Sequence, residues 1–559
     1  MMRPLRAACL VSLLASLCAS LSACAKPDVE STPTGGTIII ATAGDASHLI
    51  PTHWESTSDR MLAELLFDPL VEIGPERNVF GDAGFVRRLA SQWAWTADSL
   101  AIRFTLDSTA AWHDGQPVVA RDAVAAFRVL KGRFNPGSLK TEMKEIDSVA
   151  APDDRTVVVH FSRKSPYQLY FASHILPIPT HITDAIADSL LERSAWAQRP
   201  VGSGPYRLAR REPGVETELV AVADHYRGRP GPDRILFSTS PTAESGVARV
   251  LSGEADMWEL LAPQFVPEAE KYPDVRLIRS ESFGYAFAAF NFRDPNDSSR
   301  PHPLLRERAL RRALTMAIDR ERNVRTRFGS EARAGLGPFA RINSPADSDL
   351  THIPYDTIAA DRVLDSLGWT ARNRDGIRVR NGRPLMFTAL VPEASGGRRA
   401  MAELMQEQFR NVGVDLRIVI GDDKVFGSRL KSGRFDLLFG GWGTTPLRTS
   451  IQGTWGSRGP DPWGAQNQAY YANAEADSAI ARAVRELTPA EAAPHYRRAY
   501  QLIIDDAAAI WLYEVTEAHA VHARLLTPPW RAEAWWRTIP LWRVDPAKRL
   551  PRDAAPVTP

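Results

Sequence analysis

Strand-like and helix-like segments alternate along most of this sequence, and that alternation is the feature that most restricts its fold. Residues 37–41 form an apolar run rich in isoleucine, and residues 60–67 repeat apolar side chains at helical spacing. A second helical pattern over 401–412 is closed by Gly413 and followed by the alternating strand pattern of 414–418. Such alternation predicts mixed α/β domains whose sheets are covered by helices. The 559 residues are enough for roughly three or four domains with large cores.

The N-terminus has the pattern of an export signal. A short basic region precedes residues 7–21, an apolar run that is too short to cross a bilayer. The run leads into L-S-A-C ending at Cys24, which resembles the lipobox of bacterial lipoproteins. We therefore expect residues 1–23 to be a lipoprotein signal peptide, Cys24 to carry the lipid and residues 24–36 to be a flexible tether. The alternative is an ordinary signal peptide followed by a chance cysteine.

Cysteine content and charge limit the stabilising forces and the partners. All three cysteines, Cys9, Cys18 and Cys24, lie at or before the expected processing site. The mature chain would therefore contain no disulfide, and its stability must come from core burial. Loss of Arg3 and Arg6 with the signal peptide changes the formal net charge from +2 to 0, which argues against nucleic-acid binding. No later apolar run reaches about 18 residues, so we expect attachment through lipid alone, in the periplasm or on the outer face of the cell membrane.

The common catalytic motifs are absent from the sequence. It contains no H-E-x-x-H, no Walker glycine–lysine loop and no G-x-S-x-G. Residues 428–431 match S-x-x-K, but the S-D-N and K-T-G partners of a β-lactamase are missing. No cysteine accompanies His48 and His53, or His174 and His181, so we predict neither a metal site nor a cofactor. A hydrolase that pairs two carboxylates in space stays open, because such a pair leaves no sequence pattern.

The stretch from 434 to 449 is a candidate wall of a binding site. Residues 435–439 have the pattern of a buried strand, which Gly440 and Gly441 end before Trp442. An aromatic ring beside glycines combines an apolar surface with accessible backbone groups, a combination that suits a ligand. The alternative is a core strand closed by a tryptophan plug.

Five segments together resemble one family, the extracytoplasmic solute-binding proteins of ABC importers in the peptide- and nickel-binding branch, family 5. The segments are 112–117 (W-H-D-G-Q-P), 201–206 (V-G-S-G-P-Y), 308–319 (ending A-L-T-M-A-I-D), 363–369 (ending G-W) and 435–442 (F-D to W). They follow the order of the family's motifs and cover almost all of the mature chain. Ser203 stands where the family usually has threonine, and Val363 stands where it usually has leucine.

The resemblance implies a two-lobed α/β fold of the periplasmic-binding-protein type, class II or cluster C, with an extra inserted domain. The implied boundaries are 37–68, 197–286 and 508–545 for a discontinuous first lobe, 69–196 for the inserted domain and 287–507 for the second lobe. Two chain crossings, near 287–292 and 507–514, would form a hinge. Residues 546–559 are expected to be a frayed polar tail.

The resemblance also implies that a ligand lies between the lobes, which selects candidate contacts. They are Trp54, Glu55, Tyr285, Gly441, Trp442, Thr444, Thr445 and Arg448. In peptide-binding relatives a W-x-x-D pattern supplies an acid for the ligand's amine, but here Thr445 stands at the position of that acid. Arg448 is a candidate partner for an anionic group. Core packing or plain surface exposure is the alternative for these side chains.

Taken with the resemblance, the sequence predicts a non-catalytic, monomeric, lipid-anchored receptor. It would deliver a peptide-like or other small organic solute to the permease subunits of an ABC importer, by closing its lobes on the ligand. No cofactor, metal or nucleic acid is expected. Two alternatives stay open: an exported lipid-anchored hydrolase, and a partner-binding lipoprotein that binds no solute.

Overall fold

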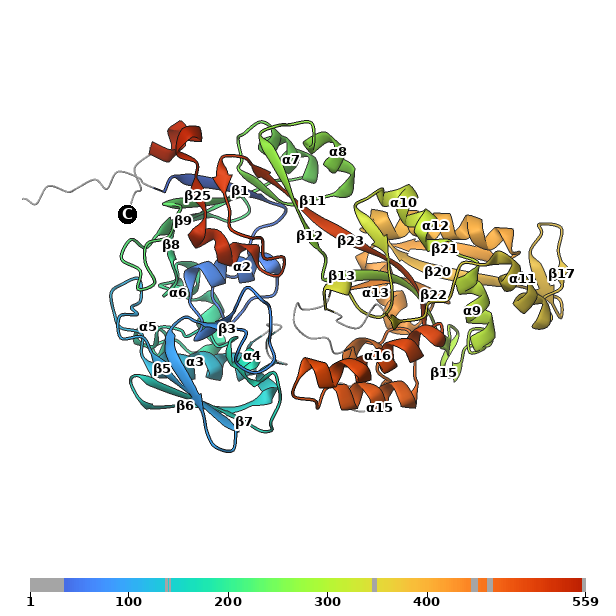
Figure 1. Ribbon diagram of the computed structural model, residues 1–559, viewed down its shortest axis with the longest axis horizontal. Helices are drawn as coiled ribbons and strands as arrows, with labels where there is room; N and C mark the ends of the chain where they lie inside the picture. The colour runs from blue at the N-terminus through green and yellow to red at the C-terminus, as the bar shows by residue number, and fades with distance from the viewer. Residues whose placement is uncertain are drawn as a thin grey trace, which may run out of the picture.

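A computed structural model of the chain describes residues 35–135, 139, 142–343, 349–443, 451–459 and 466–554. The described residues form two lobes, on the left and on the right of Figure 1. Helices and strands alternate in both lobes, so the mixed α/β, two-lobed fold expected from the sequence is confirmed.

One twelve-stranded sheet extends through both lobes. In the first lobe β1 is parallel to both of its neighbours, with Ile40 opposite Phe237 of β10 and Met257 of β11. Ile38 and Ile40 of β1 are fully buried, as expected for a central strand. The other first-lobe strands are β8 (Tyr206–Glu212), β9 (Glu216–Ala221), β10 (Arg234–Thr239), β11 (Met257–Leu261) and β12 (Val275–Glu281), beside β1 (Thr37–Thr42). The first-lobe helices include α2 (Thr57–Leu66), α7 (Ala243–Leu251) and α8 (Val266–Ala269).

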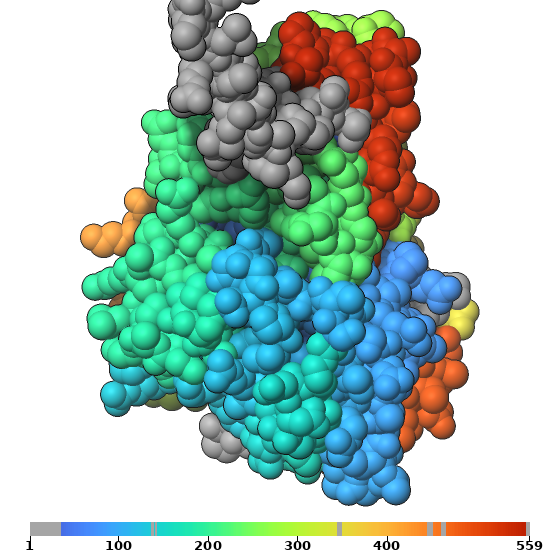
Figure 2. All heavy atoms as spheres, turned by 90° about the vertical axis from the view of Figure 1, so that its left-hand side faces the viewer, coloured from blue at the N-terminus to red at the C-terminus, as the bar shows by residue number. Residues whose placement is uncertain are grey.

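The inserted domain has its own sheet but shares a hydrophobic core with the first lobe. Phe67, at the end of α2, packs edge-on against Trp112 and Trp196, with ring centroids 6.4 and 6.0 Å away. The four strands, in the order β4-β5-β7-β6, are β4 (Ala90–Trp95), β5 (Ala101–Leu106), β6 (Ile146–Asp153) and β7 (Thr156–Phe161). The helices are α3 (Ala120–Lys131), α4 (Gln168–Ala172), α5 (Thr180–Thr183) and α6 (Ala195–Gln198). Figure 2 shows this domain in blue and cyan at the lower end of the first lobe, with the red C-terminal segment at the upper end.

The second lobe buries both faces of its part of the sheet. Along β13 (Gly284–Phe290), Ala288 and Phe290 contribute to one core cluster, and Phe287 and Ala289 contribute to the cluster on the opposite face. Its other strands are β16 (Ala332–Ala334), β20 (Met386–Pro392), β21 (Asp415–Gly421) and β22 (Leu437–Gly443). Its longer helices are α9 (Arg308–Met316), α10 (Arg320–Phe328), α11 (Thr357–Ser366), α12 (Gly396–Asn411), α13 (Asp423–Ser432), α15 (Ala474–Ala483) and α16 (Pro489–Asp505).

The lobes are connected by one long strand and one short link. The strand β23 (Ala509–His522) pairs with β13 through Ala509–Tyr513 and with β12 through Thr516–His522. The link is Ser282–Phe283, between the end of β12 and the start of β13. The expected crossings, 287–292 and 507–514, therefore lie too deep in the second lobe, because strand pairing starts there earlier than sequence periodicity indicated.

The expectation of a frayed C-terminal tail is wrong for residues 546–554. Two short 3-10 helices, η8 (Pro546–Lys548) and η9 (Pro551–Ala554), hold this segment against the first lobe. Asp553 is buried, accepts a hydrogen bond from the backbone N–H of Thr37 at 2.9 Å and pairs with Arg524 at 2.8 Å. The polar composition of the segment was misleading, because the Asp553 carboxylate fixes the start of β1.

Candidate functional site

The second-lobe wall is the end of β22. Trp442 lies opposite Tyr285 in the antiparallel pairing of β22 with β13, and Gly443 lies opposite Gly284. Since Gly284 directly follows the link between the lobes, this end of β22 lies beside the crossing. The Trp442 side chain is partly exposed, and its ring centroid is 6.4 Å from that of Phe287. Trp442 is therefore the outer member of an aromatic cluster, with one part open to solvent.

The glycines before Trp442 serve packing within the protein. A Cβ atom on Gly440 would come within 2.7 Å of the Phe287 ring, so this glycine makes room for that ring. A Cβ atom on Gly441 would lie 3.2 Å from the carbonyl oxygen of Tyr285. The pocket beside Trp442 is about 10 Å³, room for about one water molecule. A ligand at this wall would have to contact the exposed part of Trp442.

Tyr285 lies in the core. Its side chain is buried, and its hydroxyl oxygen accepts a hydrogen bond from Nε1 of Trp455 at 2.8 Å. Burial raises the pKa of Tyr285 well above its usual value. The sequence predicted this residue just before the hinge, in the first lobe, whereas it follows the link and belongs to the second-lobe strand β13, and its hydroxyl is bonded within the protein.

Four residues singled out from the sequence lie outside the described residues. They are Thr444, Thr445, Arg448 and Cys24. Their roles stay predictions from the sequence.

A pocket of about 280 Å³ opens in the first lobe. The helices α2 and α4 contribute to it, and Figure 1 places both in the half of the first lobe nearer to the second lobe. Its lining includes Trp54, Glu55, Arg60, Glu64, His174 and Arg537. Trp54 is 4% exposed, whereas Glu55 is exposed, and the Glu55 carboxylate has no polar partner in the described part of the chain. Both first-lobe candidates from the sequence thus line one pocket.

One buried carboxylate fixes the loop that carries Trp54 and Glu55. The side chain of Asp59 accepts hydrogen bonds from four backbone N–H groups, those of Ser47, His48, Glu55 and Ser56, at 2.7–3.1 Å. Burial alone would raise the pKa of Asp59, but these donors outweigh it and lower the pKa below its usual value. The ionised carboxylate therefore ties the loop to the first turn of α2.

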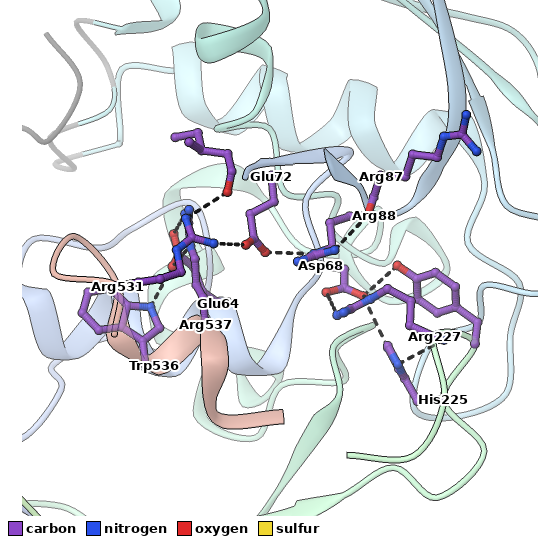
Figure 3. A network of polar contacts seen from close by, with 12 residues as sticks. Glu64, Asp68, Glu72, Arg87, Arg88, His225, Arg227, Arg531, Trp536 and Arg537 are labelled. Atoms are coloured by element: carbon purple, nitrogen blue, oxygen red, sulfur yellow. Dashed lines mark hydrogen bonds and ion pairs between the residues drawn. The ribbon is translucent and has the colours of Figure 1, made fainter. Parts of the chain in front are cut away.

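Buried ion pairs lie at the pocket, where Glu64 and Arg537 belong to its lining (Figure 3). Glu64 of α2 accepts hydrogen bonds from Nε of Arg537 at 2.8 Å and from Nε1 of Trp536 at 2.7 Å. Although burial alone would raise the pKa of Glu64, the guanidinium groups of Arg537 and Arg60 hold it well below its usual range. Behind this pair, Glu72 bridges two further arginines, Arg88 and Arg531.

His174 is a neutral hydrogen-bond acceptor in the same pocket. Burial, together with the nearby charge of Arg60, lowers its pKa to about 4. Its Nδ1 lies 2.8 Å from the carbonyl oxygen of Tyr170. A carbonyl can only accept, so Nδ1 carries the proton and Nε2 keeps its lone pair.

Comparison with known proteins decides the family. A family model described as bacterial extracellular solute-binding proteins, family 5 middle, matches residues 84–459. The chain belongs to this family. The oligopeptide-binding protein AppA of Bacillus subtilis is 23% identical over 552 residues, which cover 94% of this chain and 98% of that protein.

Solved structures of related proteins show the same fold. The structure of Bacillus subtilis AppA in complex with a nonapeptide has a TM-score of 0.72 at 21% identity, and covers 92% of this chain and 100% of that chain. The structure of NikZ from Campylobacter jejuni in complex with Ni(L-His) also has a TM-score of 0.72 at 21% identity, and covers 91% of this chain and 99% of that chain. At these identities the likeness establishes the fold and leaves the ligand open.

Two of the family motifs act as scaffold in this member. Gly202 and Gly204 pack against the end of α2, where an added Cβ would lie 1.9 Å from the carbonyl oxygen of Leu66 and 2.5 Å from that of Leu65. His113 accepts a hydrogen bond from the Gly202 N–H at 3.1 Å, so its Nε2 carries the proton and donates to the Gly204 carbonyl at 3.0 Å. The motifs 112–117 and 201–206 therefore hold α2 in place below the pocket.

Arg60, His174 and Arg537 are pocket residues that sequence reasoning missed. Arg60 lies on α2, where its position on the polar side of the helical pattern was a usable signal. His174 and Arg537 come from segments far along the chain, and no local pattern links them to α2. Among the described residues, no group of three or more His, Cys, Asp or Glu side chains is placed to hold a metal. None of the helices in the same residues has the length and apolarity needed to cross a membrane.

Replacing Asp59 by asparagine is expected to lower the free energy of unfolding by about 3 kcal/mol at pH 7, because one carbonyl oxygen cannot serve four donors. The pKa of Asp59 is depressed in the folded state, so its contribution is present above the unfolded pKa of about 4 and is lost as pH falls through the folded pKa. The difference between wild type and variant should therefore shrink below about pH 4. Urea unfolding at several pH values measures this, with the exposed Asp375→Asn as control; a loss below about 1 kcal/mol at pH 7 would contradict the assigned role.

Proposed function

We propose that this chain is a non-catalytic receptor that binds a peptide-like or other small organic solute between its lobes. It delivers the solute to the permease subunits of an ABC importer, acts as a monomer and is held at the membrane by a lipid on Cys24. Family membership and the likeness to an oligopeptide-binding protein along nearly the whole chain support this function. The observation that carries it is the first-lobe pocket, which combines buried aromatic rings with an exposed, unpaired carboxylate.

The Glu55 carboxylate is the candidate partner for a ligand ammonium group. The sequence has Thr445 at the position of the family's amine-binding acid, and an ammonium group taken out of water without a counter-charge is costly. Glu55 lines the pocket and has no polar partner among the residues the structure describes. It can therefore supply from the first lobe the charge that the second-lobe loop lacks in sequence.

Closure of the lobes on the ligand is supported by a point where they meet. Leu487, between α15 and α16, is 53% exposed and lines a pocket of about 260 Å³. The other lining residues, which include Asp82 and Trp95, all belong to the inserted domain. Covering the Leu487 side chain would favour the closed state and add to the affinity for a ligand held between the lobes.

Wild-type protein is expected to be stabilised by short peptides with a free N-terminus, by about 2.7 kcal/mol when the peptide is at 100 times its Kd. Glu55→Gln should weaken such peptides about tenfold and leave N-acetylated peptides unchanged, because only the ammonium loses its partner. Thermal-shift screening followed by calorimetric titration measures both effects, with the exposed Glu76→Gln as the matched control.

The same screen separates the alternative functions. Opines, sugars and nickel–histidine chelates are included beside the peptides. Hydrolysis of a bound peptide would show that the protein is a hydrolase and not a receptor. Absence of stabilisation by every class would leave the partner-binding lipoprotein as the better explanation.

Leu487→Asp is expected to raise the Kd about fivefold, because closure would bring a second carboxylate toward Asp82 and bury less apolar surface. The melting temperature of the free protein should stay unchanged, since Leu487 is already exposed. Titration calorimetry and small-angle X-ray scattering with and without ligand measure the effect. Leu190→Asp, at a similarly exposed leucine of the inserted domain, is the control, and equal Kd values for the two variants would argue against this contact in closure.

Cys24→Ala is expected to abolish incorporation of labelled fatty acid and to release the protein from the membrane fraction. Labelling of bacterial cultures followed by cell fractionation measures both. Retention of label in the variant would show that the lipid is attached elsewhere or that the expected lipobox is not used.

A further inference from the structure

Arg60 is held in a fixed orientation at the first-lobe pocket. Its Nε donates to Oε1 of Glu64 at 2.9 Å, one turn further along α2. Its guanidinium carbon lies 5.9 Å from the ring centroid of Trp54 and 5.6 Å from that of Trp536. Both indoles are buried, so the guanidinium group rests on rigid apolar surfaces. An arginine fixed in this way loses little conformational entropy when a ligand binds to it.

The terminal nitrogens of Arg60 are available to a ligand. Only Nε forms a hydrogen bond with the protein in the part of the chain that the structure describes. The side chain is 28% exposed and lines the pocket of about 280 Å³. The two terminal nitrogens of a guanidinium group form a fork that matches the two oxygens of a carboxylate.

The ion-paired cluster of Arg60 has one positive charge in excess, and the carboxylates of Glu55 and Glu142 line the same pocket outside this cluster. Glu64 is shared between Arg60 and Arg537, so it cannot neutralise both. Arg60, Arg537 and Glu64 form one ion-paired cluster with two guanidinium groups and one carboxylate, which gives a net charge of 2 − 1 = +1. A separate set of ion pairs, Arg88 and Arg531 with Glu72 and Glu533, is balanced. His174 faces the same pocket in its neutral form and adds no charge.

A second arginine in the pocket is also incompletely satisfied. Nη1 of Arg537 is buried and has no hydrogen-bond partner among the described residues. Its Nε and Nη2 are both directed to Glu64. A buried guanidinium nitrogen without a partner is costly, and an anion in the adjoining pocket would reduce that cost through its charge.

We propose that Arg60 is the residue that recognises a carboxylate group of the solute in the first-lobe pocket. This inference rests on the proposed receptor function and narrows its ligand class to carboxylate-bearing solutes. Since Glu55 lines the same pocket, a solute that carries both an ammonium and a carboxylate group satisfies both charges, whereas a purely anionic solute would be opposed by Glu55. A peptide offers such a carboxylate at its C-terminus or on an acidic side chain.

The test compares acids with their amides. A pool of pentapeptides is titrated into full-length mature protein as free acids and as C-terminal amides, and a second pair of pools contains glutamate or glutamine at internal positions. Wild type should bind one acid pool at least tenfold more tightly than its amide counterpart. The pair that shows the preference identifies the source of the carboxylate, the C-terminus or a side chain.

Arg60→Gln should remove this acid preference, so that each acid pool binds no more tightly than its amide counterpart. Arg60→Lys should restore only part of the preference, because an ammonium group keeps the charge but loses the fork. Arg121→Gln, at an exposed arginine on α3, is the control and should keep the full preference. Melting temperatures establish that each variant is folded, and the lysine variant supplies the result if Arg60→Gln does not fold.

The outcomes separate this inference from the receptor function. An unchanged acid preference in folded Arg60→Gln and Arg60→Lys would overturn the role of Arg60 while the receptor function stands. Equal binding of acids and amides by wild type would also overturn the role of Arg60 while the receptor function stands. A wild type that binds none of the four pools overturns the carboxylate inference, and the receptor function then depends on the other solute classes.

Discussion

The arrangement of the lobes depends on the strand β23, which is hydrogen-bonded into both of them. Its first residues continue the second-lobe sheet beside β13, and its last residues continue the first-lobe sheet beside β11 and β12. Because strand hydrogen bonds are obligatory in a buried sheet, β23 holds the two lobes together, and Ser282–Phe283 is the second connection between them. The strand comes late in the sequence, so the two sheets can be joined only when most of the chain has been synthesised.

Buried ion pairs fix the relative positions of several segments of the first lobe. Arg524 pairs with Asp256 and Asp553 and also donates to the carbonyl oxygen of Thr37, so the end of the chain is fixed to its first strand. A second network joins α2 to the C-terminal segment below the pocket. Such pairs contribute less to stability than apolar packing of the same volume would, but breaking one partner is expensive. They thereby specify one geometry for the pocket in a lobe that, by its sequence, contains no disulfide.

The sequence predicted the fold better than the site. Periodicity gave the α/β class, and the order of five motifs gave the family, because both depend on local patterns. The same patterns misled on function, since Gly440, in the middle of β22, accommodates Phe287, and Gly202 accommodates the end of α2. A glycine indicates that another group approaches the backbone closely, but the sequence does not say whether that group belongs to a ligand or to the protein itself. Tyr285 was selected by its position near the lobe boundary, and strand alternation turns its side chain into the core.

The sequence by itself determined the alternation of strands and helices, the family and two residues of the first-lobe pocket, Trp54 and Glu55. These follow from short-range patterns, in which side chains a few residues apart share one surface. Only the tertiary structure decided that Arg60 rests on Trp536 and shares Glu64 with Arg537. Those contacts join the start of the chain to its end, and pairing across that distance depends on how the whole first lobe packs. The charge balance of the pocket follows from that packing alone.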